Sequence, residues 1–277
     1  MEQGSTNVNI VSRTVQPQRQ TIRNRVAFLE KRTPVYASVL GVLGILTLWE
    51  GLARIQVIPP LFLPSPSAIL AAGWQMVTTG EVTDNILTSL MRIGTGYAIG
   101  AVAGIVIGLL LGFFRWVDSV LTPVIYSIYP IPKIALLPLF ILWLGIGELP
   151  KFTIIALGVF FPVVINTYAG VKQVDPILLK AAVTFGSKYF SVIRKVILPA
   201  ALPTIFAGLK LAAGNSLLLL VSAEMIAAEK GVGSMILHYG NLMMTTNLMV
   251  GVLILSMLGL LFNRSLEWLE RKLLPWK

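Results

Sequence analysis

Six long apolar stretches alternate with polar segments along the chain. They cover residues 35–53, 86–113, 119–145, 152–171, 200–227 and 247–266. A transmembrane helix needs about 20 mainly apolar residues to cross a hydrocarbon core of about 30 Å. The pattern therefore predicts an all-α, polytopic membrane protein with about six transmembrane helices. It also predicts two regions, a polar segment at 1–34 and a transmembrane domain at 35–277.

The composition agrees with a membrane protein and excludes most soluble classes. Of the 277 residues, 56% are hydrophobic and 12% are charged, whereas roughly a quarter of the residues of a soluble domain are charged. The formal charge of +10 would suggest nucleic acid as the partner of a soluble protein. Here the basic residues flank apolar segments, so no nucleic-acid partner is expected. The chain has no cysteine, and His238 is its single histidine, so no metal site is expected.

The distribution of basic residues predicts the orientation, because Lys and Arg are retained on the cytoplasmic side of a membrane. Most of them lie in 1–34, at Arg115, in 172–199 and from Arg264 onward. The predicted outer segments hold Arg54, Lys151 and Lys230. Both termini are therefore expected in the cytoplasm. The segment 1–34 lacks an apolar core, so we expect a basic cytoplasmic tail rather than a cleavable signal peptide.

The polar segment between the fourth and fifth apolar stretches is typical of a short helix with a defined start. Asp175 can cap the free amides of a first turn that contains Pro176, where the missing N–H of proline costs nothing. Gly186 permits a bend, and basic residues follow before the next apolar stretch. We therefore expect a cytoplasmic helix at about 175–190, held between two membrane helices and able to transmit force.

The order and spacing of Ala181-Ala182, Gly186 and Leu198-Pro199 resemble the coupling loop of binding-protein-dependent ABC importer permeases. Three further phrases are similar to the branch of this family that handles nitrate, sulfonates, taurine and bicarbonate. They are Leu63-Pro64-Ser65-Pro66, the stretch from Pro138 to Gly147, and Ala223-Glu224-Met225-Ile226. The resemblance covers most of the chain after Leu63. It implies the type I ABC importer permease fold, in which a coupling helix occupies a groove of the ATPase subunit.

The same resemblance implies the contact residues and the partners. The ATPase-coupling residues would be Lys180, Ala181, Ala182, Gly186, Leu198 and Pro199. Lys180 stands where the family often has Glu, so the usual acidic contact is not expected there. The implied partners are two ATP-binding ABC subunits, a periplasmic or extracellular solute-binding protein, a second permease copy in a homodimer, and membrane lipid. ATP and Mg would bind to the partner subunits, so this chain would hold no cofactor, and its location would be the bacterial inner membrane.

Two lysines within apolar stretches are candidates for a translocation pathway, because burying a charge in a bilayer costs at least a few kcal/mol. Lys133 follows Pro130 and Pro132, and broken backbone at membrane depth usually faces protein or a watery cavity. Lys210 has Asn215 about one turn further on. Ammonium groups there would favour an anion. The hypothesis assigns the pathway to Lys133, Lys210, Asn215 and Ser222. Alternatively, Lys210 pairs with a carbonyl group or snorkels toward the cytoplasm.

Arg92 and Glu224 are a candidate structural ion pair. Both lie near the outer ends of antiparallel spans, where a pair costs less than two lone charges. A role in contacting the solute is the alternative for these two residues.

Glycines recur at every fourth position of the second apolar stretch. They are Gly96, Gly100, Gly104, Gly108 and Gly112. Small residues on one face let another helix approach closely, and in lipid such contact is stabilised by packing. The pattern predicts a helix-packing seam within one subunit, or alternatively a surface that slides during gating.

These features favour a transport subunit over an enzyme. The chain lacks a Walker phosphate loop, and its single histidine leaves a nucleophile without a base. The expected function is a permease that passes a small anion, such as nitrate, bicarbonate, taurine or an alkanesulfonate, from a solute-binding protein to the cytoplasm. The alternatives are an autonomous secondary transporter, which needs intramembrane carboxylates, and ABC import of a pyrimidine precursor or an aromatic acid. Six spans are few for a closed pathway, so a two-fold pair is expected.

Overall fold

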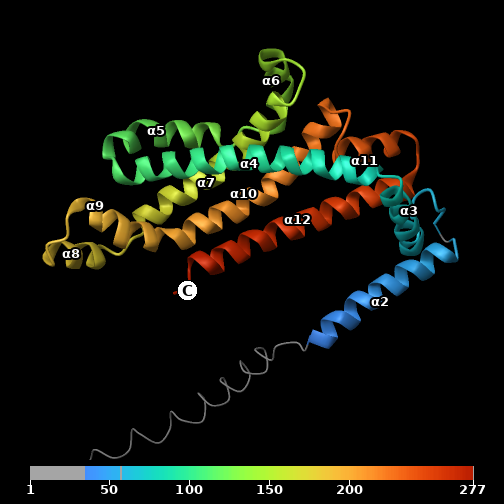
Figure 1. Cartoon of the computed structure of the whole chain (residues 1–277), viewed down its shortest axis with the longest axis horizontal. Coiled ribbons are helices and arrows are strands. Elements are labelled where there is room, and N and C mark those ends of the chain that lie inside the picture. The colour runs from blue at the N-terminus through green and yellow to red at the C-terminus, as the bar shows by residue number, and fades with distance from the viewer. Residues whose placement is uncertain (1–34, 57, 277) are drawn as a thin grey trace, which may run out of the picture. The chain divides into compact units, whose positions relative to one another are not determined.

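The computed structural model describes residues 35–56 and 58–276, and these residues form helices and turns without a β-strand (Figure 1). This confirms the all-α prediction. The chain divides into two units, Met1–Ile55 and Gln56–Lys277. The described helix of the first unit is α2 (Val35–Arg54), whose range matches the first predicted span. The predicted tail at 1–34 lies outside the described residues.

The second unit holds the other described elements. They are α3 (Pro66–Thr78), α4 (Glu81–Phe113), α5 (Arg115–Ile128), the 3₁₀ turn η1 (Lys133–Leu136), α6 (Leu137–Leu144), α7 (Leu149–Lys172), α8 (Pro176–Thr184), α9 (Tyr189–Val192), the π-helical turn η2 (Ile193–Ile197), α10 (Leu198–Ala227), α11 (Val232–Asn241) and α12 (Thr245–Leu273).

Within the described residues, four helical stretches are long and apolar enough to cross a membrane. They are α4, α7, the stretch from α9 to α10, and α12. A fifth is obtained if α5 and the η1–α6 pair, which are bent by 89° relative to each other, count as one span. The break between them contains Pro130 and Pro132, which lack the N–H that continues a helix. The span predicted at 119–145 is thus two shorter helices, and α2 as a further span stays a prediction.

The five regularly spaced glycines of α4 face α7. A methyl group at Gly104 would lie 2.9 Å from the carbonyl oxygen of Phe160, and one at Gly108 would lie 2.6 Å from Cβ of Thr167. Real Cβ atoms essentially never come so close. Glycine at these positions therefore allows the two helix backbones to touch, and the seam is a contact within one subunit.

α7 is the central helix of the second unit. It packs against α4 through the glycine seam and against α10 along most of its length. Its side chains at Ile154, Ile155, Val159 and Val163 are fully buried. α12 packs on α10, α11 and α3, while much of its surface stays uncovered within the unit. In Figure 1, α8 and α9 lie at one end of this unit, and α3 and α11 lie at the other.

Candidate functional site

The segment predicted to couple to an ATPase consists of two short helices and a turn. The carboxylate of Asp175 accepts a hydrogen bond from the amide of Ile177 at 2.8 Å, and Pro176 occupies the first turn of α8. Gly186 has φ +71°, a left-handed conformation that favours glycine. Its amide donates to Val183 and the next amide donates to Ala182, which closes the C-terminus of α8 as a Schellman motif. The helix predicted at about 175–190 therefore ends at Thr184.

The side chains of this segment are exposed to an unusual degree for apolar residues. Phe185 at the turn is 87% exposed. Other large apolar side chains around it are exposed as well, namely Ile177, Val183, Tyr189 and Phe190. Large exposed apolar patches mark protein–protein or membrane interaction sites. Of the predicted coupling residues, Lys180, Ala181, Ala182 and Gly186 belong to this segment. Leu198 and Pro199 begin α10, behind η2.

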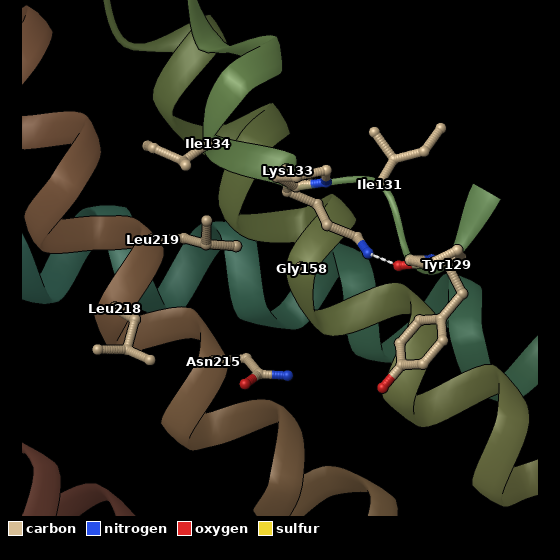
Figure 2. Close-up of a pocket in the computed structure, with 10 residues that line it drawn as sticks. Tyr129, Ile131, Lys133, Ile134, Gly158, Asn215, Leu218 and Leu219 are labelled. Atoms are coloured by element: carbon tan, nitrogen blue, oxygen red, sulfur yellow. Dashed lines mark hydrogen bonds between the residues drawn. The ribbon is translucent and has the colours of Figure 1, made fainter.

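The break between α5 and α6 opens a pocket of about 380 Å³ that faces α10 (Figure 2). Lys133 and Asn215 both line it, so the structure brings together two of the four predicted pathway residues. The ammonium group of Lys133 donates to the carbonyl oxygen of Tyr129. It also lies 4.8 Å from the ring centroids of Tyr129 and Phe161. The other lining residues are Pro130, Ile131, Pro132, Ile134, Gly158, Leu218 and Leu219.

The other two predicted pathway residues do not line this pocket. The ammonium group of Lys210 forms an ion pair with Glu270 of α12. The hydroxyl of Ser222 donates to the carbonyl oxygen of Leu218 within its own helix, at 2.8 Å. The alternatives expected for Lys210 were a carbonyl partner or snorkelling, and Glu270 was not among the expected partners. The reason is that α12 continues to Leu273, past its predicted end at residue 266.

Arg92 and Glu224 are in contact and belong to a larger charged cluster. Arg92 Nη1 lies 2.9 Å from Glu224 Oε1, and the two side chains are 4% and 0% exposed. Arg92 also donates to Glu148 from Nε at 2.6 Å and from Nη2 at 2.7 Å. Lys151 Nζ lies 2.8 Å from Glu148 Oε1. We name these four residues the Arg92 cluster; its formal charges cancel.

The Arg92 cluster holds the chain between α10 and α11 in place. Glu224 accepts hydrogen bonds from Ser89 Oγ at 2.7 Å and from the amide of Gly233 at 2.8 Å. Arg92 donates to the carbonyl oxygen of Lys230. A side chain at Gly231, where φ is +129°, would collide with Glu224. Only a residue without a Cβ fits between this turn and the buried carboxylate.

Sequence reasoning missed Glu148 as a member of this cluster. Glu148 is the N-cap residue of α7, directly before Leu149 and Pro150. An acidic residue followed by proline at a helix start was the available signal. The hydrogen bonds from Arg92, with a smaller contribution from Lys151, lower the pKa of Glu148 to about 2 against the opposing effect of burial. In the described part of the chain, no group of His, Cys, Asp and Glu could hold a metal ion.

Comparison with known proteins identifies the family. Residues 100–275 match the family described as binding-protein-dependent transport system inner membrane component. The chain belongs to this family of permeases. It is therefore the membrane-spanning subunit of an ABC importer, a transport subunit and not an enzyme. The family resemblance is confirmed, and an autonomous secondary transporter is excluded.

The permease is similar over most of its length to sulfonate transport proteins. It is 37% identical over 233 residues to an aliphatic sulfonates transport permease protein of Bacillus subtilis (strain 168), covering 84% of each chain. It is 36% identical over 243 residues to the taurine transport system permease protein of Escherichia coli (strain K12), covering 86% of the permease and 88% of the relative.

Solved structures show the same fold. The inward-facing MetNI methionine ABC transporter matches with a TM-score of 0.60 at 19% identity, over 71% of the permease and 97% of that chain. An amino acid ABC transporter matches with a TM-score of 0.58 at 19% identity, over 72% of the permease and 97% of that chain. The type I importer permease fold is thus confirmed. A permease of this type works with ATPase subunits and a solute-binding protein.

Proposed function

We propose that the permease passes a small sulfonate anion, taurine or an alkanesulfonate, from a solute-binding protein to the cytoplasm. The single observation that carries this proposal is the pocket at the α5–α6 break, which is lined by both a lysine and an asparagine. The similarity to permeases named for aliphatic sulfonates and taurine supports the sulfonate class. Nitrate and bicarbonate are smaller anions that the same positive potential would attract, and the experiment below compares them.

The pocket has the features that a transient anion site needs. The broken backbone between α5 and α6 leaves carbonyl groups that only protein or water can satisfy. The ammonium group of Lys133 supplies positive potential, while the amide of Asn215 can donate to an oxyanion. The contacts of Lys133 with Tyr129 and Phe161 hold its charge at the edge of the pocket. One lysine without a second cation attracts an anion and still permits its release.

The pathway role falls on Lys133 and Asn215 rather than on Lys210 and Ser222. The charge of Lys210 is compensated by Glu270, so it contributes little net potential. The hydroxyl of Ser222 is engaged by its own helix. Leu218, which lines the pocket, is 71% exposed. A second permease copy would cover this face and close the pathway in a homodimer.

The exposed segment from α8 to α9 is the proposed contact with the ATPase subunits, which bind ATP and Mg. It lies at the opposite end of the second unit from α11 (Figure 1). On this proposal the bacterial inner membrane holds the permease, both termini and α8 face the cytoplasm, and the outer turns receive the solute-binding protein. ATP binding would close the ATPase pair, and α8 would carry that motion to the membrane helices.

The test measures solute uptake and ATPase activity of the reconstituted permease–ATPase complex. Binding proteins loaded with taurine, an alkanesulfonate, nitrate or bicarbonate are compared. Stimulation by a sulfonate-loaded protein is the expected result. Lys133→Gln should reduce uptake about tenfold or more, because the anion loses its attracting charge. Stimulation by nitrate or bicarbonate alone would reject the sulfonate class.

The matched control neutralises the other intramembrane lysine together with its partner. Lys210→Gln with Glu270→Gln removes one charge of each sign and leaves no unpaired charge. Uptake by this double variant should stay within about twofold of the wild type if Lys133 carries the potential. Equal losses in both variants would contradict the assignment of the pathway to the pocket.

A further inference from the structure

The exposed face of α12 changes from apolar to basic and aromatic near its C-terminal end. Leu253, Met257 and Leu261 are exposed on this helix. Arg264, Trp268, Arg271 and Lys272 are exposed on its next turns. Steps of three and four residues keep all of these side chains on one face. We call the last four residues the α12 basic surface.

The length of the apolar part places the α12 basic surface at the boundary of the bilayer. From Thr245 to Asn263 the helix contains no charged residue. At 1.5 Å per residue this part is roughly 28 Å long, which matches a hydrocarbon core of about 30 Å. Arg264 therefore lies where hydrocarbon gives way to headgroups, and Arg271 and Lys272 lie about 10 to 12 Å further along the axis.

The cations of this surface are incompletely compensated by the permease itself. Arg264 Nη1 lies 3.5 Å from Glu267. Glu270 points to Lys210 and is buried. Across residues 35–56 and 58–276, no carboxylate lies within ion-pair distance of Arg271 or Lys272. Lys272 Nζ lies 5.2 Å from the ring centroid of Trp268.

A hollow beside this surface offers room for a headgroup. It measures about 360 Å³ and is lined by Glu270, Arg271, Leu274 and Pro275. Arg271 thus borders both the hollow and the exposed face. A tryptophan with one apolar and one wet edge is typical of the membrane interface, and Trp268 is 63% exposed between the cations.

We propose that the α12 basic surface binds the headgroups of anionic phospholipids. The phosphate would accept hydrogen bonds from the guanidinium of Arg271 and the ammonium of Lys272. The acyl chains would follow the apolar face of α12 toward Leu253. Trp268 would sit at the level of the ester groups. The binding depends on the membrane position of α12 and not on which solute is transported.

The experiment measures lipid retention by the full-length permease. The purified chain is exchanged into nanodiscs of phosphatidylcholine with or without phosphatidylglycerol, and retained lipids are counted by native mass spectrometry after release. Each cation near a charged membrane surface contributes about a fivefold preference. Arg271→Gln with Lys272→Gln should therefore reduce the preference for phosphatidylglycerol roughly 25-fold. Arg271→Lys with Lys272→Arg, which keeps both charges, should retain most of it.

A second pair of cations provides the matched control. Lys180→Gln with Lys188→Gln removes the same charge from two exposed residues around α8, outside the stretches that are long and apolar enough to cross a membrane. This variant should keep the preference for phosphatidylglycerol. Equal losses in the two double variants would show a general charge effect and overturn the proposal. Loss of the retained lipid when the ATPase subunit binds would assign the surface to that subunit instead, and would also overturn it.

Discussion

Arg92 Nη1 lies 2.9 Å from Glu224 Oε1, although the two residues are separated by 132 positions in the chain. Both are almost completely excluded from solvent, so the contact differs from a surface salt bridge, which contributes little. Arg92 also donates to Glu148 and to the carbonyl oxygen of Lys230. Glu224 uses its remaining lone pairs on Ser89 and Gly233. The pair therefore joins α4, the start of α7 and the turn before α11 into one unit.

Removal of Arg92 should strongly destabilise the permease. Arg92→Met would leave Glu224 buried without a compensating charge, and breaking a buried pair in this way costs about 3–5 kcal/mol. Combining it with Glu224→Gln should recover a substantial part of the loss, because the amide keeps the hydrogen-bonding shape without the charge. Thermal unfolding in detergent and gel filtration measure both variants. A double variant no more stable than Arg92→Met would show that the charge is not the cause.

The geometry also changes the expectation for a charge swap. If Arg92 and Glu224 were an isolated pair, Arg92→Glu with Glu224→Arg would restore the attraction. In the structure, a glutamate at position 92 would face Glu148, and an arginine at position 224 would face the amide of Gly233. The swapped variant should therefore remain as unstable as either single reversal, and recovery in the same unfolding assay would contradict the four-residue cluster.

The stability supplied by Glu148 should depend on pH in the acidic range. Its pKa is about 2 in the folded permease against an ordinary value of 4.5. As the pH falls, the unfolded state therefore takes up a proton first. The stabilisation is complete above about pH 4.5 and disappears as the pH approaches about 2. The unfolding temperature of the wild type should exceed that of Glu148→Gln at neutral pH, and the difference should shrink below about pH 4.5. A difference that is constant across this range would count against the ion pair.

The α4–α7 seam should tolerate no added methyl group. Gly104→Ala would place Cβ 2.9 Å from both a carbonyl oxygen and Val163 of α7, and such overpacking costs about 1–3 kcal/mol. Gly94 provides a matched control on the same helix, because nothing lies within 4 Å of its added Cβ. Gly94→Ala should be neutral or slightly stabilising, since alanine is the better helix former. Thermal unfolding measures the stability of the two variants. Equal losses of stability in both would contradict the prediction.

The sequence predicts the glycine face of α4 but not the helix that this face meets. A four-residue repeat defines a face of one helix, whereas its partner depends on how the helices are arranged in space. The same limit explains why the ion pairs were only partly predicted from the sequence. Arg92 and Glu224 were recognised because both are charges within apolar stretches. Glu148 and Glu270 were missed because each lies just outside the predicted end of a span, where hydropathy gives no signal.

The broken span between α5 and α6 shows a different limit of prediction from the sequence. Pro130 and Pro132 indicated interrupted hydrogen bonding, and this placed Lys133 next to irregular backbone. The 89° bend that turns the interruption into a pocket depends on packing against α7 and α10. Lys210 has the same charge and also lies within an apolar stretch, but it forms an ion pair with Glu270 of α12. Two lysines that look equivalent in sequence therefore have different neighbours.

A bulky residue at Gly186 should uncouple ATP hydrolysis from uptake. Nothing lies within 4 Å of a Cβ at this position, so the substitution causes no collision. Its effect comes from φ +71°, where a residue with Cβ costs about 1–2 kcal/mol and a β-branched residue is least tolerated. Gly186→Val would open the Schellman turn and change the angle between α8 and α9. ATPase activity should persist while binding-protein-dependent uptake falls about tenfold, a loss equivalent to about 1.4 kcal/mol of coupling.

Two variants separate a coupling defect from a general loss of stability. Asparagine tolerates the left-handed conformation, so Gly186→Asn should keep most of the uptake. Gly80 has φ +81° and no atom within 4 Å of an added Cβ, but it precedes α4, away from α8 in the second unit (Figure 1). Gly80→Val should therefore bring similar strain while uptake per ATP hydrolysed stays normal. A low ratio of uptake to hydrolysis in Gly80→Val, or a normal ratio in Gly186→Val, would show that the turn after α8 does not transmit the motion.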